Sequence, residues 1–158
     1  MITELLGLGV LAADQVLKQK IEKQDPDTFP RAMDGSKGKI LLYCFHNDGL
    51  PFGKLKEYPR LVKLLPTAMT AGLCAEYLAL KKKNKSPLMQ SACALLICGS
   101  LSNLLDRFRL GYVVDYFSPQ FGRMKKAIYN LGDFAIFIGS GLLLLASLFG
   151  KSKKETKR

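Results

Sequence analysis

Residues 99–115 have the sequence GSLSNLLDRFRLGYVVD, and this stretch decides how the rest of the chain is interpreted. An apolar run over 88–97 leads directly into a polar segment that contains Asp106 and Arg107. Two valines after the following turn precede a second acid, Asp115. Ionisable residues beside an apolar span are costly to place, which makes them functional candidates by default. The stretch therefore predicts a functional site where a membrane span meets water.

Apolar residues are concentrated in blocks along the 158-residue chain, a length typical of one domain. The chain is 48% apolar and its mean hydropathy is only +0.08, because charged residues fill the intervals between the blocks. About 20 apolar residues cross a bilayer. Soluble helices with one buried face are the alternative, but these runs are apolar all round. We expect four membrane spans at about 2–17, 61–80, 88–105 and 128–149, within a single domain over 1–150.

Basic residues predict the orientation of these spans. Lysines gather over 81–85, between the second and third spans, and again in the tail over 151–158. Since basic residues beside short loops mark the cytoplasmic side, both termini and the tail are expected in the cytoplasm. The segments 18–60 and 106–127 are then extracytoplasmic. The net charge of +11 is explained by these blocks, and no aromatic-and-basic array of the nucleic-acid-binding kind is present.

The outer segments contain signals for a small β element. Residues 39–45 are β-prone and are followed by a turn signature at 46–49, while 112–117 is typical of a short strand. Residues 54–65 mix apolar and basic side chains, which favours an interfacial helix that bends at Pro59. The predicted fold class is an all-α membrane protein with four transmembrane helices, a small extracytoplasmic β element and an interfacial helix.

The predicted topology collects polar residues at one depth. Each lies at the outer end of a span or on an outer connection. The set comprises Asp14, Asn103, Asp106, Arg107, Asp115, Asn130 and Asp133. Two carboxylates held close together cannot both ionise cheaply, so such a pair shares a proton and can supply an acid and a base. We therefore expect Asp115 and Asp133 to form a catalytic pair near the outer face of the membrane. Amide side chains can orient such acids without adding charge.

Simpler interpretations remain for several of these residues. Asp106 and Arg107 are adjacent and could form an ion pair that closes a helix end. Asp14 and Lys18, four residues apart, could pair on one helix face. His46 is the single histidine and is expected at the surface, so neither a Ser-His scheme nor a zinc site is favoured. The four cysteines lack metal-ligand spacing, and neither a metal nor a cofactor is expected.

Five short motifs occur in order along the chain. They are DQVLK at 14–18, NDGLPFG at 47–53, SNLLDR at 102–107, GYVVDY at 111–116 and YNLGD at 129–133. In these motifs and their order the chain resembles lipoprotein signal peptidase (signal peptidase II), a family of bacterial aspartic proteases with four transmembrane helices.

The resemblance implies an aspartic endopeptidase that removes the signal peptide from diacylglyceryl-modified prolipoproteins, cleaving before the lipidated cysteine. It places the catalytic aspartates at Asp115 and Asp133, either of which could be the acid. It places the supporting positions at Asp14, Lys18, Asn47, Asn103, Arg107 and Asn130. It also implies an outer sheet and interfacial helix over the site, contact with membrane lipids, and inhibition by globomycin-type antibiotics.

The chain departs from the family pattern at a few positions. Leu50 and Pro51 stand where small residues are usual, which bears on substrate and inhibitor preference. Further departures are Ser102 for glycine, Gly132 for alanine, and Tyr116 and Tyr129 for phenylalanine. The alternative from another class is a non-catalytic membrane binder or small transporter that uses the buried acids as a proton or cation site.

Overall fold

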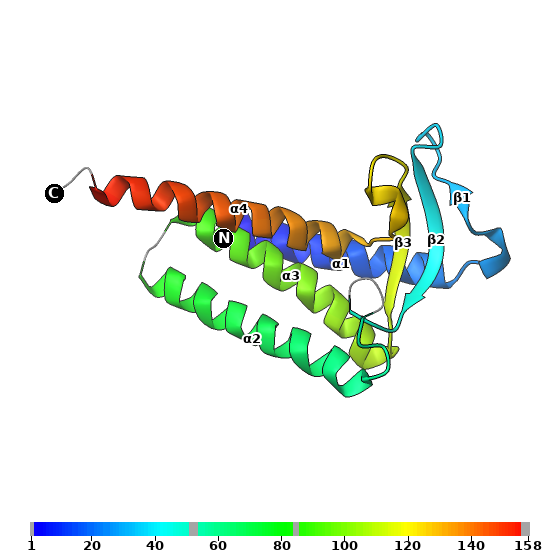
Figure 1. Cartoon of the computed structure of the whole chain (residues 1–158), viewed down its shortest axis with the longest axis horizontal. Helices are drawn as coiled ribbons and strands as arrows, with labels where there is room; N and C mark the ends of the chain where they lie inside the picture. The colour runs from blue at the N-terminus through cyan, green and yellow to red at the C-terminus, as the bar shows by residue number, and fades with distance from the viewer. Residues whose placement is uncertain (1, 51–53, 84–85, 156–158) are drawn as a thin grey trace.

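The computed structural model describes residues 2–50, 54–83 and 86–155. Four long helices make up most of it: α1 (Ile2–Glu22), α2 (Pro59–Lys82), α3 (Pro87–Arg109) and α4 (Leu131–Glu155). A sheet of three strands, β1 (Arg31–Ala32), β2 (Ile40–Asn47) and β3 (Val113–Pro119), lies at one end of the helices (Figure 1). Two short 3-10 helices, Pro26–Thr28 and Met124–Lys126, occur in the connections. The fold is therefore mostly helical with a small β element, as predicted.

Glycines allow α3 and α4 to approach closely. A Cβ on Gly99 would overlap the carbonyl oxygen of Gly132 on the facing helix. Two helical turns further along α4, a Cβ on Gly139 would lie 2.9 Å from the carbonyl oxygen of Ala92. The small residues in the third predicted span thus serve close helix packing. The contact fixes the start of α4 against the C-terminal half of α3.

Two helices in the described part of the chain are long and apolar enough to cross a membrane. They are Pro87–Arg109 and Leu131–Leu148, which match the third and fourth predicted spans. The first and second predicted spans also form helices, α1 and α2, but charged residues keep both below that level of hydropathy. Large apolar side chains nevertheless face outward on these two helices, with Leu5 62% exposed and Met69 71% exposed.

The sheet is antiparallel with strand order β1-β2-β3. Its longer pair aligns Phe45 with Asp115 and Ile40 with Pro119, and the register is irregular between Leu42 and Phe45. Both strands fall where the β-prone segments predicted them. The sheet packs on the end of α1 through a buried cluster of Ile21, Val114 and Tyr116.

Of the predicted interfacial helix over 54–65, only residues 59–65 are helical, and they form the start of α2. Leu55 has a φ of 59°, a left-handed conformation that a right-handed helix excludes, and a turn over 55–57 leads straight into α2. Pro59 is the first residue of α2 rather than a bend, because the first helical position requires no N–H and suits the fixed φ of proline. Residues 51–53 of the NDGLPFG motif lie outside the described residues. At the other end of the chain α4 continues to Glu155, into the predicted tail.

Candidate active site

Backbone pairing brings Asp115 and Asp133 together from different elements. Asp115 lies in the middle of β3, and Tyr129 attaches the later segment to the same strand. The N–H of Phe117 donates to the carbonyl of Tyr129 at 3.0 Å, and the N–H of Tyr129 donates to the carbonyl of Phe117 at 2.8 Å. Asn130 therefore lies beside Asp115, and α4 starts at the next residue with Asp133 in its first turn.

Asn130 joins the two acids directly. Its side-chain Nδ2 donates to Asp115 Oδ1 at 2.6 Å, and its Oδ1 accepts from the backbone N–H of Asp133 at 2.9 Å. The backbone N–H of Asn130 donates in turn to Asp133 Oδ2 at 3.2 Å. This reciprocal arrangement is a capping box, so Asp133 also caps the N-terminus of α4. The cap fixes where the carboxylate of Asp133 lies.

Two further asparagines donate to the same acids. Asn47 donates through Nδ2 to Asp115 Oδ2 at 3.0 Å, while its Oδ1 accepts from the N–H of Gly49. Asn103 donates through Nδ2 to Asp133 Oδ1 at 2.9 Å. Each amide oxygen is occupied by a donor, and this determines which way the amide faces. Each acid therefore receives hydrogen bonds from neutral amides, and no ion pair to either acid occurs among the residues that the structure describes.

A buried charge network lies behind Asn103. Lys18 Nζ donates to Asn103 Oδ1 and contacts Asp14 Oδ2 and Asp106 Oδ2, each at 2.9 Å. These three charged side chains are between 0% and 3% exposed. The predicted pair of Asp14 and Lys18 is confirmed. The predicted pair of Asp106 with Arg107 is wrong, because the carboxylate of Asp106 turns toward Lys18 across the helix interface.

Further polar groups complete this network. Ser102 donates its hydroxyl to Asp14 Oδ2 at 2.6 Å, and Tyr116 donates to Asp14 Oδ1 at 2.9 Å. Gln15 donates to Asp106 Oδ1 at 2.9 Å, and the backbone N–H of Val114 donates to Asp106 Oδ2 at 3.2 Å. The network joins α1, α3 and β3 and makes them one rigid support for the acids.

Arg107 contacts a backbone carbonyl rather than the adjacent carboxylate of Asp106. Its Nη2 donates to the carbonyl of Gly49 at 3.0 Å, which attaches α3 to the chain just after β2. The residue is 6% exposed, and its Nε has no hydrogen-bond partner in the described part of the chain. A buried donor in this state is available to a bound molecule.

The surroundings of Asp115 favour its neutral form. Burial is the largest cause and the negative charge of Asp133 the second, and together they raise the pKa of Asp115 to about 7. The hydrogen bonds from Asn47 and Asn130 act in the opposite direction. An acid that titrates near neutral pH beside a second carboxylate can hold the proton that the pair shares.

The structure thus brings together all of the polar residues predicted to converge. Sequence reasoning missed the contributions of Gln15, Ser102 and Tyr116, although all three stand within the quoted motifs. Their signal was spacing: Ser102 lies one helical turn before Asp106, and Tyr116 immediately follows Asp115. Neither spacing identifies the partner, because Asp14 is more than 80 residues away from both.

A pair of carboxylates held by amides lies at one end of apolar helices. A family profile for Signal peptidase (SPase) II matches residues 6–149. A lipoprotein signal peptidase from Azoarcus sp. (strain BH72) is 32% identical over 155 residues, covering 96% of this chain and 85% of that relative. The chain belongs to the signal peptidase II family, and it is therefore a membrane peptidase.

Other comparisons agree with this assignment. A lipoprotein signal peptidase from Actinobacillus succinogenes is 34% identical over 114 residues, covering 71% of this chain and 70% of the relative. A bacterial membrane enzyme structure solved by the in meso method at 2.3 Å superposes with a TM-score of 0.82 at 24% identity, covering 99% of this chain and 93% of that one. That similarity supports the fold.

Proposed function

We propose that this protein removes the signal peptide from diacylglyceryl-modified prolipoproteins by aspartic catalysis, with Asp115 and Asp133 as the catalytic pair. The observation that carries the proposal is the side chain of Asn130, which hydrogen-bonds both residues and holds them side by side. The family of the chain supplies the peptidase class. Cleavage is expected immediately before the lipidated cysteine.

The proposed chemistry uses one proton on the pair. Asp115, with a pKa of about 7, starts protonated and donates to the scissile carbonyl oxygen, while ionised Asp133 takes a proton from the attacking water. A bond forms between the water oxygen and the carbonyl carbon. Collapse of this tetrahedral intermediate breaks the C–N bond: Asp133 gives its proton to the leaving amine, and Asp115 takes a proton back from a hydroxyl of the intermediate. The amides position both carboxylates throughout.

Arg107 and an apolar groove are proposed to hold the substrate. The unpartnered Nε of Arg107 is a donor for a carbonyl of the bound peptide. A shallow groove runs along α1 and ends at the head of α4, and it is lined by Leu5, Leu6, Gly9, Val10, Ala13 and Leu131. Leu131 is two residues before Asp133, so an acyl chain or apolar signal segment in this groove leads toward the catalytic pair. Globomycin-type inhibitors are expected to compete for the same place.

We also propose four membrane spans, with both termini cytoplasmic and the site near the outer face of the cell membrane. The outward-facing apolar side chains of α1 and α2 support the two additional spans, since water-soluble proteins rarely expose such patches. Lys81 and Lys82 end α2 away from the sheet, on the side expected to be cytoplasmic. Residues 1–150 then form one peptidase domain.

The test is gel-resolved cleavage of a lipidated prolipoprotein by the purified wild type and by Asp115→Asn and Asp133→Asn. Loss of an acid or base is expected to cost about 10²–10⁴-fold or more in rate. Asp34→Asn makes the same change at an exposed loop position and is the matched control. Folding of each variant is checked by its melting temperature. Near-normal cleavage by either active-site variant, or an inert wild type, would exclude the proposal and favour the binder or transporter.

A further inference from the structure

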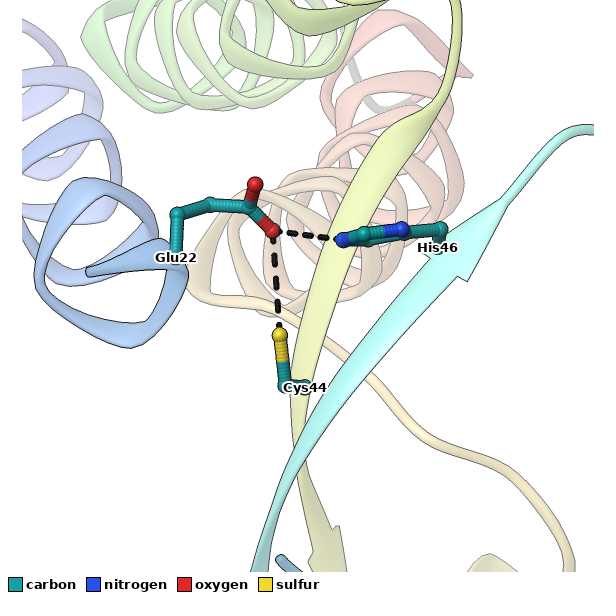
Figure 2. Close-up of side chains that lie close together, drawn as sticks. All are labelled: Glu22, Cys44 and His46. Atoms are coloured by element: carbon teal, nitrogen blue, oxygen red, sulfur yellow. Dashed lines mark hydrogen bonds and ion pairs between the residues drawn. The ribbon is translucent and has the colours of Figure 1, made fainter. Parts of the chain in front are cut away.

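Three metal-ligating side chains converge outside the catalytic pair, where the end of α1 meets β2. Glu22 Oε1 lies 2.7 Å from His46 Nε2 and 3.8 Å from Cys44 Sγ (Figure 2). The three ligand atoms all lie within 4.8 Å of one another. We propose that Glu22, Cys44 and His46 bind a divalent transition metal, with Zn²⁺ the best match.

The choice of metal follows from the ligand set. Thiolate, imidazole and carboxylate together are the donors that zinc uses, whereas magnesium and calcium require oxygen ligands. Bond lengths of about 2.0–2.3 Å in a tetrahedral site place ligand atoms roughly 3.4–3.6 Å apart. The Cys44 to Glu22 separation is close to this value, and the shorter His46 to Glu22 separation needs to open by less than about 1 Å. His46 is exposed and can make this adjustment.

Charge and proton balance also fit zinc. Binding displaces the proton of the Cys44 thiol to solvent, and His46 binds as neutral imidazole. One thiolate and one carboxylate then neutralise the two charges of the ion. Water fills the fourth position, as at other zinc sites with three protein ligands.

Tyr112 contacts two of the three proposed ligands, Glu22 and His46. Its hydroxyl donates to Glu22 Oε2 at 3.2 Å, which leaves Oε1 facing the other two ligands. Its ring stacks on the imidazole of His46 at a centroid distance of 4.1 Å and an interplanar angle of 22°. Outer groups of this kind orient the ligands of metal sites. The cluster therefore has both ligands and the contacts that hold them in place.

The site would connect two parts of the catalytic support. Glu22 lies one helical turn after Lys18 on α1, and His46 immediately precedes Asn47, which donates to Asp115. A metal between α1 and β2 would fix the strand that carries Asn47. Zinc is thus expected to stabilise the fold, whatever reaction the aspartates perform.

The test uses the full-length protein without an affinity tag, titrated with Zn²⁺ against a chromophoric chelator and with Co²⁺ as a spectroscopic probe. The wild type should bind one ion and show a sulfur-to-cobalt charge-transfer band, and zinc should raise its melting temperature. Cys44→Ser should abolish the band and weaken zinc binding by more than about 100-fold, because even outer-shell losses cost about 10–100-fold. Cys74→Ser is the matched control and should bind as the wild type does.

Two further variants separate the possible results. Tyr112→Phe keeps every ligand and should weaken zinc binding by about 10–100-fold. Asp115→Asn should bind zinc unchanged, because the catalytic pair is not part of the site. A cobalt band that persists in Cys44→Ser, or zinc binding equal in the wild type and Cys44→Ser, would show that the three side chains form only a hydrogen-bonded cluster.

Discussion

Replacing Lys18 by methionine tests whether the buried charge network supports the catalytic pair. Methionine has a similar length and flexibility but no charge and no N–H donor. The variant therefore leaves the carboxylates of Asp14 and Asp106 buried without the cation that contacts both at 2.9 Å. It also removes the donor that occupies the amide oxygen of Asn103.

The expected loss of stability follows from this geometry. Removing one partner of a buried ion pair costs about 3–5 kcal/mol, and both remaining carboxylates are at most 3% exposed. At about 2–4 °C per kcal/mol for a chain of this size, the melting temperature should fall by roughly 6–20 °C. The rate should fall as well, because a released Asn103 amide can turn its oxygen toward Asp133. A misplaced catalytic group costs about 10²-fold.

The assay pairs thermal unfolding of the purified protein with cleavage of a lipidated prolipoprotein. Lys20→Met, an exposed position on the same helix, is the control and should change neither. Adding Asp106→Asn to Lys18→Met removes one of the unpaired charges and should recover part of the melting temperature. If Lys18→Met matched the Lys20 control in both measurements, the network would have no supporting role and the argument would be refuted.

Three other predictions follow from single contacts. Because the pKa of Asp115 is raised to about 7, the shared proton is present below that pH and lost above it, so kcat/KM should fall as the pH rises above about 7. Asn47→Ala removes a hydrogen bond to the ionised form of Asp115 and should therefore move this fall in kcat/KM to higher pH. Gly99→Ala should cost about 1–3 kcal/mol in unfolding measurements through overlap with α4, whereas Gly141→Ala, which meets open space, should not destabilise. Tyr116→Phe loses a hydrogen bond to a buried carboxylate and should cost about 1.5–3 kcal/mol by the same measurement while retaining more activity than the aspartate variants.

Much of the fold was predictable because apolar length and turn chemistry are local properties. The third and fourth spans and the two longer strands were located from runs of side chains alone. The helix predicted from residue 54 begins only at Pro59, because the left-handed backbone at Leu55 interrupts a segment whose mixed composition favours an amphipathic helix. That backbone depends on the loop around it and leaves no signal in composition.

The site was predictable in position but not in its contacts. The alternating directions of the helices predict that Asp14, Asp115 and Asp133 come to one end, because Asp14 and Asp133 stand near helix ends and Asp115 on the connection between α3 and α4. The partner of Asp106 was not predictable, since adjacency in sequence suggested Arg107 while helix packing supplies Lys18. The cluster of Glu22, Cys44 and His46 was missed for the same reason: metal-ligand spacing describes ligands within one segment, and this set combines a helix end with a strand.

The separation of charges explains how this chain can keep two acids reactive beside a membrane. Lys18 contacts Asp14 and Asp106, while Asp115 and Asp133 are held by the amides of Asn47, Asn103 and Asn130. A lysine in direct contact would keep Asp115 ionised and remove the proton that an acid–base pair must share. Neutral donors fix its position and leave its pKa near 7. We therefore expect Lys18 to act through the orientation of Asn103, so that its removal reduces the rate while Asp115 and Asp133 remain.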